Sequence, residues 1–525
     1  MKKLIFCLMS AALINYAQAQ KTEALKQKYA SYISVDDAKK HLNILASDAF
    51  EGRETGKPGA EKAANYISGE FKKMGLQGPV NNSYFLDVPL DENTSKVTAF
   101  NVSNQSFENG KDFLMRGTFG NTNTHATDVI FIGYGTAEEV GNTDLTGKVL
   151  LWINEDKPLT GTTANTSYRM SAARTKIIRE IQSKHPAIIL AANAGIADVL
   201  KRFGSSYTAS SLSLKKETPA AASQTAPVIN IDLAVADALT KPTGQDFNTL
   251  KTASAAGNVP AKSIKSNFTI GYHTETKPAK AVDVVGFLPG SDPKLKDEVL
   301  VFSAHYDHIG LTTSGTDKVN NGADDDGSGT TGILEIARAF TEAKKAGHGS
   351  RRSILFLGNV GEEKGLLGSE YYTDHPVFPL SRTITDLNID MIGRTGYDYQ
   401  GKADSSNYVY VIGSSMLSTE LHKINEEANN KFTKLDLDYK YDDPNDPNRF
   451  YYRSDHYNFA KHGVPIIFYF DGEHQDYHRP GDEVSKINFP LLVKRAQLVF
   501  YTGWELANRD KRPVVDAKSD KAESQ

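Results

Sequence analysis

The sequence has almost no cysteine: Cys7 is the only one among 525 residues. It lies inside an apolar N-terminal run that a secreted protein would lose. A mature chain that begins after this run has no thiol, so it forms no disulfide and offers no cysteine as nucleophile or metal ligand. Any metal ion that it binds must be held by His, Asp and Glu side chains.

Net charge and long apolar runs are also scarce. The formal net charge is −4, and so weak an imbalance argues against a nucleic acid or an anionic membrane as partner. The N-terminal apolar run, Leu4–Ile14, is too short to span a bilayer. We find no other candidate span, and we therefore expect no membrane anchor.

The N-terminus has the pattern of a secretory signal. Lys2 and Lys3 precede the run Leu4–Ile14, and Ala17 and Ala19 form a small-x-small cleavage site. This predicts a signal peptide over residues 1–19 and a secreted or periplasmic protein. A buried N-terminal helix is the alternative.

The remaining length suits two or three domains, since a domain typically has about 150 residues. Apolar residues at helical spacing predict helices over Val35–Ala46 and Ala60–Met74. A middle block of strands and helices has no clustered metal-ligand residues, which indicates a non-catalytic module. The next block alternates strands with helices, which predicts a largely parallel sheet with its chemistry at the carboxyl ends of the strands. We place the N-terminal helices in 20–94, the middle block in 95–278 and the strand-helix block in 279–509. Residues 510–525 form a polar tail that we expect to be disordered.

Two segments of the strand-helix block carry the first candidate ligands. A predicted strand ends at His305, and Asp307 could accept the second ring N–H of this histidine and so select the ligating tautomer. Asp324, Asp325 and Asp326 stand among glycines just before a predicted helix, where a cation would offset their charge. The alternative for His305 and Asp307 is an ordinary surface pair. The alternative for the three aspartates is a solvated turn that caps the helix, or a calcium-binding loop.

Three further segments follow predicted strands. Glu362 and Glu363 are adjacent, which suits one carboxylate that binds metal and one that acts as general base. Asp390 interrupts a buried-looking strand and needs a partner, either a metal or an arginine. His478 could complete a site, and Tyr477 beside it could donate to an oxyanion. Each segment alone is ambiguous, but together they supply two histidines and three carboxylates, a ligand set for two zinc ions that share one carboxylate.

These five segments resemble the co-catalytic zinc aminopeptidase family, which includes bacterial leucyl aminopeptidases, aminopeptidase Y and glutamate carboxypeptidase. The resemblance spans about 279–505 and rests on AHYDH, NGADDDGSG, GEEKGLLGS, NIDMIGR and DYHRPGDE. It implies a three-layer α/β/α zinc-peptidase domain with a mixed, largely parallel sheet, to which 20–94 adds its N-terminal part. The middle block is similar to a smaller α/β protease-associated domain inserted into it.

Residue roles follow from the resemblance. It implies that His305 and Asp390 hold one zinc ion and that Glu363 and His478 hold the other. It also implies that Asp324 bridges both ions and that Asp325 follows across a cis peptide. By the same resemblance Glu362 is the general base, Asp307 lies behind His305, and segment Arg453–His456 supports or lines the site. The remaining histidines of this block receive no ligating role: His308, His456, His462 and His474.

We therefore expect a secreted exopeptidase, an aminopeptidase whose substrates are peptides with a free N-terminus. A carboxypeptidase of the same family is an alternative, because several arginines could bind a substrate carboxylate. A glutaminyl cyclase uses one zinc ion, and the His305–Asp307 pair argues against it. A receptor-like ectodomain that lost the chemistry is the non-enzyme alternative, and it should lack ligands or the base.

Overall fold

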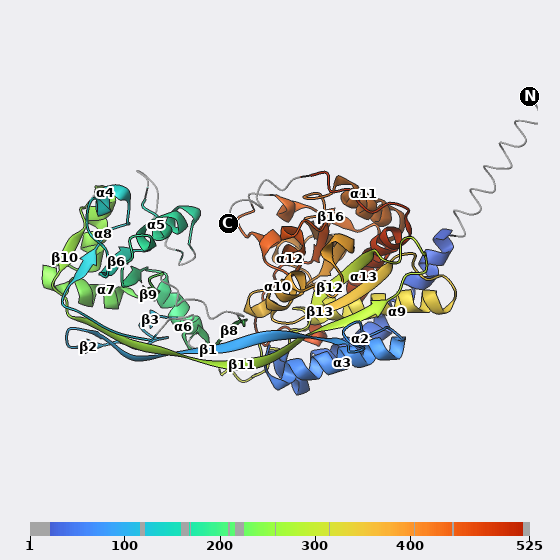
Figure 1. Cartoon of the computed structure of the whole chain (residues 1–525), viewed down its shortest axis with the longest axis horizontal. Coiled ribbons are helices and arrows are strands. Elements are labelled where there is room, and N and C mark those ends of the chain that lie inside the picture. Colours follow the sequence, from blue (N-terminus) through green and yellow to red (C-terminus); the bar gives the residue numbers. More distant parts are fainter. Residues whose placement is uncertain are drawn as a thin grey trace, which may run out of the picture. The chain divides into compact units, whose positions relative to one another are not determined.

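The computed structural model describes residues 22–517 except for 116–120, 159–166, 168–169, 208–209, 216–224, 258, 314, 404 and 444–445. The predicted signal peptide, with Cys7, and the last part of the polar tail lie outside the described residues. The chain divides into two compact units (Figure 1). One contains Met1–Pro89 and Lys280–Gln525, and the other is Leu90–Ala279.

The first unit is built on a mixed sheet whose strands run in the order β16-β15-β17-β14-β12-β13-β11-β1. The four central strands β17, β14, β12 and β13 are parallel, whereas β15 and β11 run antiparallel to their central neighbours. The largely parallel sheet of the prediction is therefore confirmed. The strands are β1 Phe85–Val102, β11 Phe268–Leu288, β12 Val299–His305, β13 Ser353–Asn359, β14 Thr383–Ile389, β15 Tyr408–Ile412, β16 Asp436–Asp438 and β17 Ile466–Phe470, of which β1 and β11 continue past Pro89 and Lys280 into the second unit.

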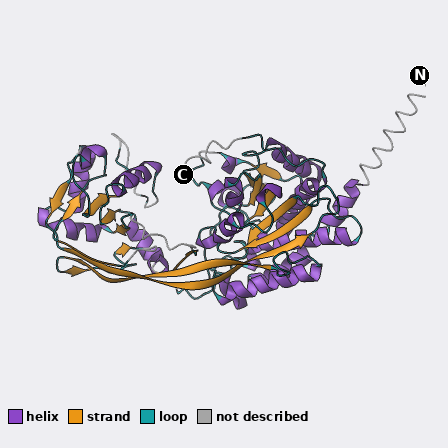
Figure 2. Cartoon of the chain, in the orientation of Figure 1, coloured by secondary structure: helices purple, strands orange, loops and turns teal. Residues whose placement is uncertain are grey.

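Helices cover both faces of this sheet (Figure 2). Alternate residues of β12 point to opposite faces: Phe302 packs on Phe340 of α9 and against Gly503 of α13, whereas Val301 belongs to the cluster with Tyr372 of α10. Helices α2 and α3 contact α9, and α11 contacts α13. The helices are α2 Val35–Leu45, α3 Pro58–Met74, α9 Gly327–Lys345, α10 Leu367–Asp374, α11 Thr419–Ala428, α12 His456–Lys461 and α13 Phe489–Asn508.

Local sequence explains where these helices begin and end. The Ser34 side chain caps α2 by accepting from the Asp37 N–H, and two acidic residues in the first turn favour the same end. Gly75 ends α3 in the left-handed conformation, which glycine adopts without a steric penalty. Asp326 caps α9 by accepting from the Gly329 N–H, so the acidic loop leads directly into this buried helix.

The second unit has its own sheet, in the order β10-β5-β6-β7-β9-β3, with parallel central strands. Its interior is a cluster of apolar side chains that includes Phe131, Leu151, Leu190 and Ile229. Its limits lie close to the sequence boundaries 95 and 278, and its identity as a protease-associated domain stays a prediction. Its other elements are β2 Gln105–Ser106, β3 Phe113–Leu114, β4 Thr122–Ala126, β5 Val129–Phe131, α4 Ala137–Val140, β6 Val149–Ile153, α5 Ala172–Gln182, β7 Ile188–Ala192, α6 Ile196–Tyr207, β8 Ser211–Leu214, β9 Val228–Ile231, α7 Leu233–Thr240, α8 Phe247–Ala256 and β10 Lys262–Ile264.

The described part of the C-terminal tail is bound to the first unit, contrary to the expectation of disorder from residue 510. Arg512 donates to the backbone oxygen of Ser381 at 2.9 Å, and Asp516 accepts from the backbone N–H of Thr419 at 2.9 Å. Through residue 517 the tail is therefore part of the fold. Among the described residues, no helix has the length and apolar character needed to cross a membrane.

The close packing of α13 on β12 gives a test of the core. A Cβ at Gly503 would lie 2.3 Å from Cζ of buried Phe302, so Gly503→Ala should lower the free energy of unfolding by about 1–3 kcal/mol. Gly69 in α3 is the matched control, because a Cβ there meets nothing within 4 Å. Gly69→Ala should stabilise by up to about 1 kcal/mol. Urea unfolding followed by circular dichroism measures both, and a Gly503→Ala protein as stable as the wild type contradicts this packing.

Candidate metal centre

Four parallel strands bring the predicted site residues to one edge of the sheet. Parallel strands end on the same side, so the loops that follow them meet there. The acidic loop before α9 reaches the same edge. His305 ends β12, Glu362 and Glu363 follow β13, Asp390 follows β14, and Tyr477 with His478 stands in the loop after β17.

A first group of side chains surrounds His305, which is 1% exposed. Its Nε2 lies 3.3 Å from Asp325 Oδ1 and 3.5 Å from Asp390 Oδ1. Glu362 Oε2 is 3.9 Å away. Nδ1 of His305 is 3.0 Å from the backbone oxygen of Asp307, a contact that places a ring proton on Nδ1 and turns Nε2 toward the carboxylates.

A second group surrounds Glu363. His478 Nε2 lies 3.1 Å from Glu363 Oε2 and 3.1 Å from Asp325 Oδ2. His308 Nδ1 lies 2.8 Å from Glu363 Oε1 on the other side. Asp325 contacts histidines of both groups, one with each carboxylate oxygen, so it lies between them.

The carboxylate that lies between the two groups is that of Asp325, whereas the family resemblance implied Asp324 for the bridging position. Asp324 Oδ1 accepts from the Gly393 N–H at 2.7 Å, and its Oδ2 faces His474 at 3.3 Å, so its carboxylate serves the loop after β14. Asp325 occupies the place between the groups. The cis peptide is correspondingly Asp325–Asp326, not Asp324–Asp325.

Asp307 lies beside His305, and its carboxylate makes its hydrogen bonds to other groups. Its carboxylate accepts from Thr55 Oγ1 at 2.6 Å and from the Glu362 N–H at 3.2 Å. The contact with His305 is made by its backbone oxygen, with the carboxylate 3.7 Å from Nδ1. The Asp307 side chain therefore holds the loop that carries Glu362.

Arg53, which no sequence argument singled out, binds the backbone of the acidic loop that contains Asp324–Asp326. It is 1% exposed and donates to the backbone oxygens of Tyr306, Leu45, Asn321 and Gly322 at 2.6–2.8 Å. Its position in the EGRETG stretch between α2 and α3 gave no sign of burial. A buried arginine requires several acceptors, and here these are backbone oxygens. These bonds tie the N-terminal segment to the metal-ligand loop.

Two more residues outside the predicted set orient the ligands. Ser454 Oγ donates to Asp390 Oδ2 at 2.7 Å, which agrees with a supporting role for the Arg453–His456 segment. Asp482 accepts from the backbone N–H groups of Asp324 and Asp325 at 3.0–3.1 Å. The loop that supplies His478 therefore also fixes the backbone of the acidic loop.

The pKa values of the two adjacent glutamates are shifted in opposite directions. Burial alone would raise the pKa of Glu363, but His478 and His308 outweigh it and lower this pKa to about 2. Burial opposes protonation of His478, yet Glu363 and Asp325 raise its pKa to about 11. Glu362 differs: burial, with Glu363 and Asp390 nearby, raises its pKa well above the usual range although His305 opposes this.

The donor set fits divalent cations. His305 Nε2, Asp325 Oδ2 and Glu363 Oε1 are buried and have no hydrogen-bond partner among the described residues. Such orphaned polar atoms are costly unless a ligand satisfies them. Imidazole and carboxylate groups without thiols are typical ligands of Zn²⁺ in catalytic sites.

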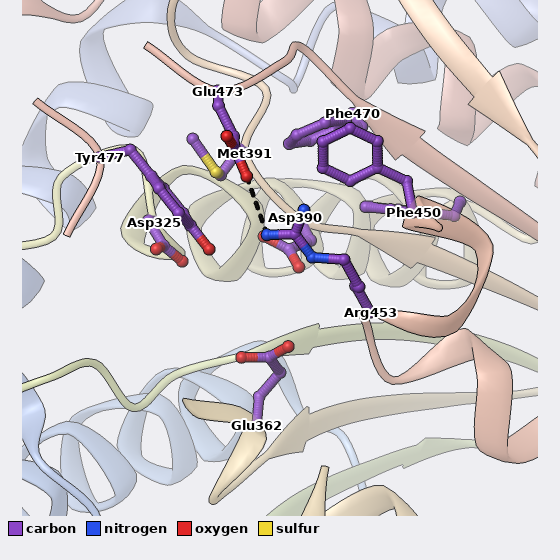
Figure 3. A pocket seen from close by; sticks show the side chains of 10 residues that line it. Asp325, Glu362, Asp390, Met391, Phe450, Arg453, Phe470, Glu473 and Tyr477 are labelled. Carbon is purple, nitrogen blue, oxygen red and sulfur yellow. Dashed lines mark hydrogen bonds and ion pairs between the residues drawn. The ribbon is translucent and has the colours of Figure 1, made fainter. Parts of the chain in front are cut away.

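The centre opens into a pocket that is acidic at one end and apolar at the other (Figure 3). Asp325, Glu362 and Asp390 line it, while Glu363 does not. Tyr477, stacked on His478 with ring centroids 3.9 Å apart, forms one wall. The apolar lining comprises Met391, Phe450, Phe468 and Phe470, with Arg453 and Glu473 beside them.

Residues 283–503 match the profile of Peptidase family M28. This segment of the chain is a peptidase M28 domain. The M28 domain carries all the groups described above except those that the N-terminal segment supplies, such as Arg53. Aminopeptidase YwaD of Bacillus subtilis is 29% identical over 255 residues, covering 46% of this chain and 48% of that protein. A probable leucine aminopeptidase 2 of Aspergillus oryzae is 27% identical over 250 residues, covering 43% and 45%.

Solved structures share the fold over most of the chain. The aminopeptidase from Aneurinibacillus sp. strain AM-1 aligns over 94% of this chain and 98% of its own, with TM-score 0.58 and 17% identity. A zinc aminopeptidase from Bacillus subtilis aligns over 93% and 98%, with TM-score 0.53 and 18% identity. The chain spans about half the length of the curated relatives that it matches in sequence.

The position of Asp325 predicts which aspartate controls metal binding. Asp325→Asn removes a charge from between the groups, so Zn²⁺ should bind at least about tenfold more weakly. Asp324→Asn is the matched control, because its carboxylate faces His474 and the Gly393 N–H instead. Isothermal titration of the metal-free proteins with Zn²⁺ gives both affinities. If only Asp324→Asn weakens Zn²⁺ binding, then Asp324 and not Asp325 is the shared ligand.

Proposed function

We propose that the protein is a secreted, two-zinc exopeptidase, an aminopeptidase that releases N-terminal residues from peptides. The observation that carries this proposal is the pair of histidine-carboxylate groups joined by Asp325, with the carboxyl group of Glu362 beside them in the pocket. The match of residues 283–503 to Peptidase family M28 supports the proposal, and so do the relatives that are named aminopeptidases.

The side chains divide into two ligand groups. His305 and Asp390 would hold one ion, Glu363 and His478 the other, and Asp325 would contact both. Bound there, zinc ions acidify a water molecule and polarise the scissile carbonyl. Ser454, Asp307 and Arg53 keep the carboxylates and their backbone in place, so the chain arranges the site before substrate arrives.

Glu362 is the residue best suited to move the proton. It lies in the turn after β13, lines the pocket and is 3.9 Å from His305, whereas Glu363 is engaged by two histidines. In this proposal it takes a proton from the attacking water and delivers it to the leaving amine. Tyr477, on the pocket wall, would donate a hydrogen bond to the tetrahedral oxyanion.

The pocket's charge favours an aminopeptidase over a carboxypeptidase. Four carboxylates line it, from Asp325, Glu362, Asp390 and Glu473, against the single arginine Arg453 among its lining residues. Arg453 is itself paired with Glu473 at 2.8 Å. Arg394, another candidate for a carboxylate pocket, pairs with Asp476 at 2.8 Å. An ammonium group suits this environment better than a carboxylate does.

The non-enzyme alternative predicts missing groups, and none is missing here: the Glu362 base and both ligand groups are present in one place. The predicted signal peptide supports secretion. We further propose that the second unit, which resembles a protease-associated domain in sequence, acts in substrate access or placement. Its described residues contribute no side chain to either ligand group.

A free N-terminus should be required for cleavage. Leucyl-p-nitroanilide and short peptides should be hydrolysed from the amino end, and N-acetylation should reduce kcat/KM by at least about a hundredfold, since it removes the cation that the acidic pocket attracts. Mass spectrometry of the products identifies the released residue. Equal cleavage of blocked peptides, or release of C-terminal residues, contradicts the aminopeptidase assignment.

The two glutamates should separate chemistry from metal binding. Glu362→Gln keeps the side-chain size but cannot accept a proton, so turnover should fall at least about a hundredfold with zinc content unchanged. Glu363→Gln is the control in the adjacent position and should lose zinc first, with activity following. Elemental analysis and kinetics of the same preparations measure both. Zinc loss in Glu362→Gln with retention in Glu363→Gln reverses the roles.

A further inference from the structure

His308 differs from the other histidines that the sequence pattern left without a role. Its side chain is 0% exposed, and its Nδ1 lies 2.8 Å from Glu363 Oε1 and 3.7 Å from Asp325 Oδ2. By contrast, the side chain of His478, which the family resemblance assigns to the same ion, is 38% exposed. The more deeply buried imidazole beside Glu363 is therefore His308.

The contact between His308 and Glu363 does not have the geometry of a hydrogen bond. Both His308 Nδ1 and Glu363 Oε1 are buried without a hydrogen-bond partner among the described residues, and so is Asp325 Oδ2. Ligand atoms of His308, Asp325 and Glu363 all lie within 4.8 Å of one another. Three orphaned donor atoms that converge in this way are what a cation site requires.

The backbone around His308 prepares the imidazole for this position. The His308 N–H donates to the backbone oxygen of Arg53 at 3.2 Å, which fixes the residue after the strand end. The ring lies over Gly322, where a Cβ would be 2.5 Å from His308 Cδ2. Gly322 has a φ of +55° and leaves the space that the ring fills. The same ring is edge-on to His478, with centroids 5.8 Å apart.

We propose that His308 is a further ligand of the second metal ion, which it binds through Nδ1 together with Asp325, Glu363 and His478. This inference rests on the proposed function and refines it. The second ion then has four protein ligands, typical of a tightly held zinc site, whereas the first has three and keeps a place for water. In this arrangement the ring proton of His308 would be on Nε2, which leaves the orphaned Nδ1 lone pair for the ion.

The sequence offers an unusually clean test, because Cys7 is its only cysteine. In a Cys7→Ser background, His308→Cys places the only thiol of the chain at this position. Nδ1 is the ring nitrogen nearer to the backbone, so a thiolate reaches a similar place. Loaded with Co²⁺, this variant should show an intense sulfur-to-cobalt charge-transfer band that the parent lacks.

The matched control is His474→Cys in the same background. His474 is also buried and also faces a carboxylate, that of Asp324 at 3.3 Å, but it belongs to neither ligand group. It should bind cobalt without the band. Two bound cobalt ions in His308→Cys without the band would overturn the inference and leave the proposed function intact. A parent that binds neither cobalt nor zinc would instead refute the proposed function.

A second variant covers the case in which His308→Cys does not fold. His308→Gln removes the imidazole and keeps a polar side chain of similar reach. Competition with a chromophoric chelator should show one zinc ion bound at least about tenfold more weakly and the other unchanged. A smaller change in both affinities contradicts coordination by His308.

Discussion

The mutual repulsion of buried carboxylates is the constraint around which the M28 domain is arranged. Asp325, Glu362, Glu363 and Asp390 converge at one sheet edge with little exposure to water. Charges of one sign in such a place are tolerated only if cations or many donors compensate them. The histidines of both groups offset this negative charge. The hydrogen bonds that hold the backbone of the acidic loop, and the strand order, keep the carboxylates and histidines together.

The sequence predicted the fold of the first unit well because its central strands are continuous apolar runs between helices with clear caps. It did not predict α13 or the full length of β1 and β11. Most of α13 is buried around its whole circumference, so its apolar residues show no amphipathic period. The middle parts of β1 and β11 are rich in polar and charged residues, and their β-structure depends on pairing rather than on local propensity.

The candidate site was predictable in its residue types and less so in its details. Strand ends followed by His or acidic residues singled out His305, the Glu362–Glu363 pair, Asp390 and His478, which the structure brings to one edge of the sheet. The division of roles between the two glutamates came from the family resemblance. Among three consecutive aspartates, however, the sequence cannot show which carboxylate faces the histidines, because this depends on the backbone path between Gly322 and α9. Arg53 and His308 act through backbone oxygens and through burial, and neither leaves a pattern in the order of residues.

The bonds from Asp482 to the backbone of Asp324 and Asp325 have a consequence for access to the pocket. One loop carries His478 and Tyr477 as well as Asp482, so its displacement would also release the carboxylate between the two ligand groups. A movement of this wall would therefore disturb the acidic loop as well as remove His478 from its ligand group. For the proposed exopeptidase, this favours a cavity that is assembled before the substrate arrives, and the end of a peptide chain enters such a cavity more readily than the interior of a folded protein does.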